Sequence, residues 1–218
     1  MASLIHSSRS FSTAPRHWAV ALLLAVLAML VPGQARAADG PGTKVVRAAN
    51  VTIATLLKQQ VIPGSPEEKK LADKVTESVR GFLDLDELGM RALGDEWKQR
   101  TPAEQAEYLA TLRALIEDNY VKGLRANLDY EVVYLAEAAA PAGNLKVSTE
   151  IKTKRKGRAV SIKVDYVLRK DAAGKLRCFD VVTDKVSLVS NYRAQFTKII
   201  KKDGFPALIA KMKKKLGK

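Results

Sequence analysis

Residues 180–196 read DVVTDKVSLVSNYRAQF, and this stretch decides the fold because it carries the change from strand to helix. Its first half alternates in β-branched residues such as Val181 and Val186, which is typical of a strand. From Tyr192 onward apolar residues recur at helical spacing, ending with Ile199 and Ile200. The sequence therefore predicts that a sheet ends here and that a helix leaves it.

Four strand-like runs lead up to this point, and they span residues 130–137, 145–154, 159–169 and 176–184. The links between them are short and carry turn residues, such as Lys156-Gly157. Because short links join antiparallel neighbours, the runs predict a four-stranded antiparallel meander.

The same runs alternate between apolar and polar residues. In the second run Leu145, Val147 and Ile151 alternate with polar residues, and the third run repeats this pattern from Val160 to Leu168. One face of the sheet is therefore apolar and the other is solvated. Helices must cover the apolar face, which predicts an α+β domain with an apolar cavity or a filled core between the layers.

The N-terminal half is predicted to be helical. Residues 38–43 are interpreted as a loose arm, and Asn50 is expected to cap a helix that ends by Ile62, before Pro63. Ser65-Pro66-Glu67-Glu68 and Thr101-Pro102-Ala103-Glu104 each place a capping hydroxyl three residues before a glutamate, so two helices begin there. A short helix over 85–97 lies between them, and the long helix from residue 102 turns Tyr108, Leu112 and Tyr120 inward, among other residues.

The C-terminus is predicted to form a helix to about Lys202, a break at Asp203-Gly204 and a last helix from Pro206. Lysines are dense here: Lys201, Lys202, Lys211, Lys213, Lys214, Lys215 and Lys218. They either complement the helix dipoles and aid solubility, or dock to an acidic membrane or partner surface.

The first 37 residues read as an export signal. Arg9 and Arg16 precede an apolar run from Trp18 to Val31, and Ala35-Arg36-Ala37 supplies a cleavage site, so cleavage is expected after Ala37. Residues 38–218 are then expected to form a single soluble domain outside the cytoplasm. Removing three arginines leaves 34 basic and 23 acidic residues, a net charge of +11. In an exported protein this charge faces anionic lipids or acidic proteins, not nucleic acid.

Residues 38–218 contain no histidine and a single cysteine, which excludes several kinds of chemistry. His6 and His17 both lie in the signal, which excludes Ser-His-Asp catalysis and His-ligated metal from the mature chain. The single Cys178 cannot form an internal disulfide, and its apolar neighbours indicate a packed thiol. We expect a binding protein, not an enzyme, with no metal and no cofactor.

Three segments in order resemble the MlaC/Ttg2 (toluene-tolerance) family of periplasmic phospholipid-binding proteins, over about residues 51–216. The first is Phe82 to Met90 leading into Ala92-Leu93-Gly94 and Trp97, and the second is Thr101-Pro102 with the helix behind it. The third is Val186-Ser187-Leu188-Val189 with Asn191-Tyr192-Arg193 and Gln195-Phe196. The chain departs from the family pattern at Lys185, where a glycine is common, and at Leu176, where a tryptophan is common.

The resemblance implies a carrier that holds phospholipid tails between sheet and helices and passes lipid between an outer-membrane complex and an inner-membrane ABC transporter complex. The hypothesis places the tails against these residues: Leu112, Ile116, Val147, Ile151, Ile162, Val164, Tyr166, Phe179, Val181, Leu188 and Tyr192. Ordinary core packing is the alternative for each of them. Trp97 and residues 191–193 are interpreted as structural, fixing the helix against the sheet, and Arg193 is the candidate for a headgroup contact.

Other classes stay open. The family includes relatives linked to hopanoid lipids, so a sterol-like ligand is an alternative. A non-catalytic envelope adaptor would have a filled core and a basic docking face. An NTF2-like or hydrolytic enzyme would need a strained carboxylate, for which Asp165, Asp180 and Asp184 are the candidates, and none has a partner base.

Overall fold

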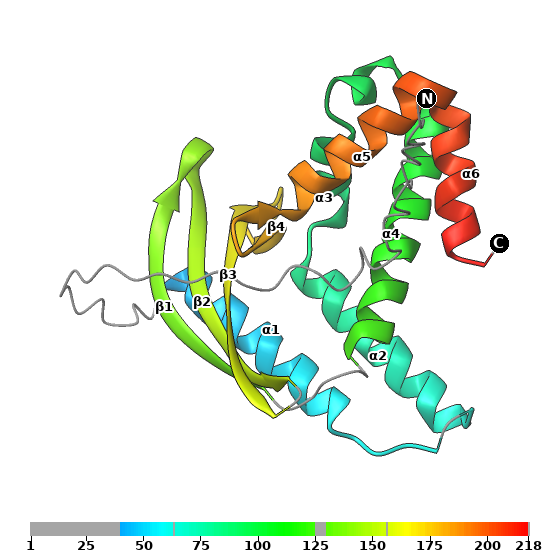
Figure 1. Ribbon diagram of the computed structural model, residues 1–218. Helices are drawn as coiled ribbons and strands as arrows, with labels where there is room; N and C mark the ends of the chain where they lie inside the picture. The colour runs from blue at the N-terminus through cyan, green and yellow to red at the C-terminus, as the bar shows by residue number, and fades with distance from the viewer. Residues whose placement is uncertain (1–39, 63, 125–129, 156, 218) are drawn as a thin grey trace, which may run out of the picture. The chain divides into compact units, whose positions relative to one another are not determined.

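An open antiparallel sheet, with helices packed on it and beyond its last strand, forms the framework of the protein (Figure 1). The computed structural model describes residues 40–62, 64–124, 130–155 and 157–217. The predicted export signal, residues 1–37, lies outside the described residues. Among those described, no helix is both long enough and apolar enough to cross a membrane.

The sheet runs in sequence order, β1 (Tyr130–Ala140), β2 (Asn144–Arg155), β3 (Arg158–Lys170), β4 (Leu176–Thr183) and β5 (Val186–Ser187), with all neighbours antiparallel. A short 3-10 turn, η2 (Pro141–Gly143), joins β1 to β2. The predicted meander is confirmed, with one small difference. The sequence predicts four strands, and the structure adds the two-residue β5, because the chain folds back at Asp184 and Lys185 before the helix begins.

The N-terminal half is helical, as predicted, with α1 (Pro41–Leu57), α2 (Pro66–Phe82), α3 (Leu85–Leu93), the 3-10 helix η1 (Gly94–Gln99) and α4 (Pro102–Leu124). Both predicted caps form. The Ser65 hydroxyl accepts from Glu68 N at 3.2 Å, and the Thr101 hydroxyl accepts from Glu104 N at 3.3 Å. The Glu104 carboxylate completes the box by accepting from Thr101 N at 2.8 Å.

The prediction for α1 is wrong at its start. Asn50 lies in the middle of the helix, where its side-chain amide donates to the Tyr134 hydroxyl at 3.1 Å, and residues 41–43 are helical. The cap comes from β1: the Glu137 carboxylate accepts from Gly42 N at 3.2 Å, from Thr43 N at 2.7 Å and from the Thr43 hydroxyl at 2.8 Å. A strand more than 90 residues away therefore satisfies the free amides of this helix start.

Helices α3 and α4 pack closely because of one glycine. A Cβ at Gly89 would lie 2.6 Å from Leu109 Cδ2 and 3.2 Å from Leu112 Cδ2, so a larger residue there would force the Leu109 side chain to shift. The Tyr108 hydroxyl donates to Gly89 O at 3.0 Å across the same contact. Tyr108, Leu112, Leu115 and Ile116 are buried, which confirms the predicted inward stripe of α4, whereas the Tyr120 side chain lies outside the described residues.

An aromatic cluster joins the C-terminal helices to α4. The ring of Tyr108 lies 6.4 Å from Trp97, 6.0 Å from Phe196 and 6.4 Å from Phe205, measured between centroids. These rings come from η1, α4, α5 (Leu188–Asp203) and α6 (Phe205–Lys215). Helix α6 therefore packs on helices, and its buried residues extend the core beyond the end of the sheet.

Buried Asp180 fixes the predicted strand-to-helix corner. Its carboxylate accepts from the Ser187 hydroxyl at 2.6 Å and from Val189 N, in the first turn of α5, at 3.1 Å. The Ser187 hydroxyl in turn accepts from Ser190 N at 3.0 Å and caps α5. One carboxylate of β4 thus sets both the turn into β5 and the start of the helix.

We predict that Glu137→Ala lowers the free energy of unfolding by about 1–2 kcal/mol, because it removes the cap of α1 and leaves half-buried amides unpaired. Urea unfolding measures this change. Glu131→Ala, at an exposed position of the same strand, is the matched control and should change the free energy by less than about 0.5 kcal/mol. Equal losses from the two variants would contradict the capping role.

Lys185 stands where the family commonly has glycine, and its φ of +71° lies in the left-handed region. A side chain there is strained, and glycine is not. We predict that Lys185→Gly raises the free energy of unfolding by about 0.5–1 kcal/mol. Lys175→Gly, in the β3–β4 turn outside the left-handed region, should lower stability instead, so a gain in both variants, or in neither, would refute this explanation.

Candidate functional site

The inward face of the sheet is fully covered at one end only. Counting across the strands, Val147 pairs with Tyr166 and Tyr166 with Val181, and Thr149 pairs with Val164. Val147, Thr149, Val164, Tyr166 and Leu168 are at most 8% exposed, and the ring of Tyr166 meets Phe82 of α2 edge to face at 5.9 Å. This end of the face is packed core.

The other end of the same face is apolar but only half-covered. Val132 pairs with Ile151 and Ile151 with Ile162, and the next row is Tyr130, Thr153 and Val160. All six side chains are half-buried. We call these two rows the open rows. Aliphatic and aromatic surface that stays partly in water is the property expected of a site that takes an apolar ligand.

Helix α1 runs along the inward face toward the open rows. Thr43 bonds to Glu137, and seven residues later Asn50 bonds to Tyr134, so the helix is antiparallel to β1. Its remaining residues extend toward Val132 and Tyr130. Two of the large apolar residues most exposed among those described, Val51 at 60% and Ile62 at 76%, lie in α1 and just after it. Exposed apolar surface is therefore also present on α1 and just after it.

A small polar group borders the open rows. The Arg47 guanidinium stacks 4.0 Å above the Tyr134 ring, and the Tyr134 hydroxyl accepts from Asn50. Burial, and the nearby Tyr134, raise the pKa of Tyr130, so the Tyr130 phenol is neutral at physiological pH. The border can donate hydrogen bonds, while the rows themselves offer mainly apolar contact.

The structure divides the predicted lipid-contact residues between two locations. Ile151, Ile162 and Val181 are half-buried on the inward face, and Leu188 is partly buried against the core. Leu112, Ile116, Val147, Val164 and Tyr166 are buried core residues. Tyr192 stacks on Phe196 at 5.2 Å, within the aromatic cluster. Sequence reasoning missed Tyr130 and Val132 because their strand lies beyond the two runs with the clearest alternation.

Phe179 does not lie where the alternation places it. The register shifts between Val167 and Leu168, so Phe179 is the extra residue of a β-bulge in β4. Its ring lies beneath the Arg91 guanidinium at 4.2 Å, and it is outside the core cluster that contains Val164 and Tyr166. The prediction that it shares their face is wrong, because one bulge reverses the alternation of a strand.

Arg193 is bound within the protein. Its Nε donates to Arg91 O at 3.0 Å and its Nη2 to the same oxygen at 2.5 Å, near the C-terminus of α3. The contact joins α5 to α3, so the structural interpretation of residues 191–193 needs one correction, which is that this arginine fixes α5 to a helix and not to the sheet. Its guanidinium retains further donors, and a headgroup contact stays a prediction.

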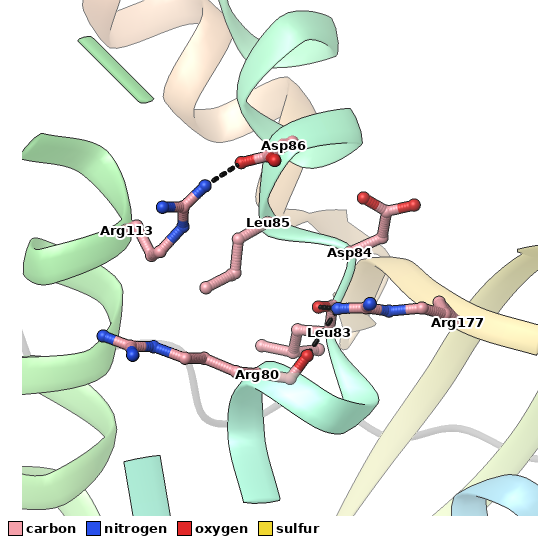
Figure 2. Close-up of a pocket in the computed structure, with 7 residues that line it drawn as sticks. All are labelled: Arg80, Leu83, Asp84, Leu85, Asp86, Arg113 and Arg177. Carbon is pink, nitrogen blue, oxygen red and sulfur yellow. Dashed lines mark hydrogen bonds and ion pairs between the residues drawn. The ribbon is translucent and has the colours of Figure 1, made fainter. Parts of the chain in front are cut away.

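A polar pocket of about 360 Å³ lies where α2 breaks into α3 (Figure 2). It is lined by Arg80, Leu83, Asp84, Leu85, Asp86, Arg113 and Arg177. Arg80 pairs with Glu117 of α4 at 2.5 Å, Arg113 pairs with Asp86 at 2.5 Å, and Arg177 Nη2 donates to Leu83 O at 2.6 Å and to Arg80 O. The lining is polar, with Arg80 and Arg113 paired to carboxylates and Arg177 held by backbone carbonyls, so this pocket does not suit an acyl chain.

The same pocket explains the first family segment. Asp84 caps α3 by accepting from Glu87 N at 3.2 Å, and it pairs with Arg169 of β3 at 2.9 Å. Asp84 N donates to Cys178 O at 2.7 Å, which adds a short parallel bridge to the edge of β4. The acidic-aliphatic segment therefore fastens α2, α3 and α4 to the sheet.

Each of the three carboxylates considered for catalysis already has a partner within the protein. Asp180 holds the α5 corner, Asp184 accepts from Lys163 N at 3.2 Å, and Asp165 lies 3.9 Å from Lys146. Burial raises the pKa of Cys178, which makes its thiol unreactive. Within the described residues, no group of His, Cys, Asp and Glu side chains could hold a metal ion.

The fold and the site define a class of protein, an α+β domain in which helices cover an antiparallel sheet and leave part of its apolar face open. A family profile described as MlaC protein matches residues 47–214, and the chain belongs to this family. The resemblance found in the three sequence segments is thereby confirmed.

One similar solved structure is the phospholipid-binding protein from Ralstonia solanacearum, in complex with a phospholipid. It is 21% identical, the match covers 79% of this chain and 94% of that chain, and the TM-score is 0.64. At this identity the likeness shows a shared fold. A comparison with curated proteins finds no match.

Proposed function

We propose that the protein is a periplasmic phospholipid carrier that holds acyl chains against the inward face of the sheet. The observation that carries the proposal is the pair of half-exposed apolar rows in a face that is otherwise packed. Membership of the MlaC family and a neighbour of the same fold that binds a phospholipid support it. The absence of His from residues 38–218 supports a binding role over a catalytic one.

The energetics of the ligand explain why such a face is needed. Two acyl chains hold on the order of 30 methylenes, and at about 0.8 kcal/mol each their exposure to water would cost more than about 20 kcal/mol. A carrier must cover nearly all of that surface. It must also release the lipid, so its affinity should be close to that of a bilayer, where a partner can shift the balance by a few kcal/mol.

The contact residues fall into two groups by their expected role. Ile151, Ile162 and Val181, with Tyr130 and Val132, are proposed to contact the tails in the closed structure. Five buried members of the predicted set, Leu112, Ile116, Val147, Val164 and Tyr166, and two that are partly buried against the core, Leu188 and Tyr192, would contact a tail only if the helices part from the sheet. Arg193 and the Arg47 border are the cationic groups available to a headgroup.

The proposed cycle includes transient contact with a membrane surface, an inner-membrane ABC-type complex and an outer-membrane complex. In this cycle the protein would accept lipid at one membrane and deliver it at the other, which maintains outer-membrane lipid asymmetry. A hopanoid ligand is the nearest alternative, because the open rows contact any flat or extended hydrocarbon. A lipid carrier would bind lipid, whereas a structural adaptor would not, so bound lipid distinguishes the two functions.

We predict that Ile151→Glu folds but takes up phospholipid at least about tenfold less than the wild type, because a carboxylate in the open rows makes an apolar ligand there unfavourable. Uptake is measured by incubating the purified protein with phosphatidylethanolamine vesicles, separating the two, and quantifying bound lipid by mass spectrometry. Ile151 suits this test better than Val164, whose side chain is only 5% exposed and whose charged substitution would unfold the core.

Lys152→Glu is the matched control, because Lys152 is the next residue in β2 and is exposed on the opposite face. It introduces the same carboxylate and should leave uptake within about twofold of the wild type. Circular dichroism establishes that both variants fold. A folded Ile151→Glu protein with full lipid uptake would show that the open rows are not the binding face.

A further inference from the structure

The last two helices, α5 and α6, carry a strong positive charge. Lys198, Lys201 and Lys202 of α5 and Lys211, Lys213, Lys214 and Lys215 of α6 are all exposed. We call these seven lysines the C-terminal basic surface. Asp203 is the only acidic residue of α5 and α6.

Local pairing does not neutralise this surface. Asp203 pairs with Lys211 at 2.6 Å, and Glu107 of α4 pairs with Lys213 at 2.6 Å. Five of the seven lysines therefore exceed these two ion pairs, which leaves a surplus of positive charge on α5 and α6.

The helix dipoles account for only a small part of the surplus. The C-terminus of a helix carries about half a negative charge, so α5 and α6 together offer about one. Lys201, Lys202, Lys213, Lys214 and Lys215 lie in the last turns of these helices. Most of their charge therefore has no counter-charge in the fold and becomes favourable beside an external anionic surface.

The structure favours a lipid surface over a folded protein partner. The apolar residues of α6 are all buried against the helical core: Phe205, Leu208, Ile209 and Met212. The C-terminal basic surface therefore lacks on α6 an apolar anchor of the kind that concentrates affinity in protein interfaces. It presents lysines and no arginine, and lysine is depleted from protein interfaces. Hydrated point charges spread along a helix match the diffuse charge of lipid headgroups.

Helix α6 is also separate from the open rows. It packs on α4 and α5, through Phe205 against Tyr108, and it covers no part of the inward sheet face (Figure 1). Neutralising its lysines should therefore leave lipid uptake unchanged, so membrane docking and lipid carriage can be tested independently.

We propose that the C-terminal basic surface docks the protein reversibly on anionic bilayers, as a peripheral contact through charge without insertion. This surface is where the transient membrane contact of the proposed function would occur. The inference rests on the proposed function only in taking the protein to be periplasmic. Its strength should fall steeply with salt, because exposed charges are screened within about 8 Å at about 0.15 M ionic strength.

The test is co-sedimentation of the mature protein with vesicles of equimolar phosphatidylcholine and phosphatidylglycerol, and with phosphatidylcholine vesicles alone. One variant carries Lys201→Gln, Lys202→Gln, Lys214→Gln and Lys215→Gln. The control carries Lys152→Gln, Lys154→Gln, Lys163→Gln and Lys170→Gln, which removes the same charge from exposed positions of β2 and β3. Each lysine near an anionic surface adds about fivefold in affinity, so the first variant should bind at least about 100-fold more weakly than the control.

Three results would overturn the proposal. The first is equal loss in both variants, which would assign binding to net charge alone. The second is binding that does not depend on phosphatidylglycerol. The third is no sedimentation of the wild type at low salt, which would leave an acidic protein as the partner of this surface. Bound lipid is quantified in the same samples, so a wild type that docks but carries no lipid would refute the proposed function and not this inference.

Discussion

A carboxylate placed at the start of a helix is the interaction on which the rest of this structure depends. Glu137 of β1 binds the first amides of α1, Asp84 caps α3 while pairing with Arg169 of β3, and Asp180 of β4 binds the first turn of α5. Each bond is strengthened by the positive end of the helix it meets. Because polar contacts fix the helix starts, the apolar face of the sheet does not have to be fully covered to hold the helices in place.

This arrangement separates stability from the candidate site. The aromatic cluster around Tyr108 and the packed end of the sheet provide the core, and the arginine pocket ties α2, α3 and α4 together through the Arg80–Glu117 and Arg113–Asp86 ion pairs. The open rows contribute only half-buried side chains, of which Ile151 and Ile162 pack against the edge of the core. Their incomplete burial costs hydrophobic free energy in the empty protein, at about 25 cal/mol per Å² of exposed apolar surface, and a bound acyl chain would recover it.

Local signals in the sequence predicted much of the fold. The capping boxes at Ser65 and Thr101 and the alternation of β2 and β3 need only neighbours along the chain, and each is present in the structure. The errors concern partners that are distant in sequence. Nothing near Pro41 shows that Glu137 will cap α1, so Asn50 was the better local candidate. The bulge at Phe179 follows from the pairing of β4 with β3, which composition does not encode. The residue types of the site were predictable, whereas their division into packed and open rows required the register.

The measurement that tests the account most directly is native mass spectrometry of the mature wild-type protein, purified without added lipid, followed by extraction and identification of what it carries. The account predicts a stoichiometric mass increment that is released as phospholipid on denaturation. A folded protein with no increment, which takes no lipid from vesicles, would contradict the carrier function and leave the family membership as a statement about fold.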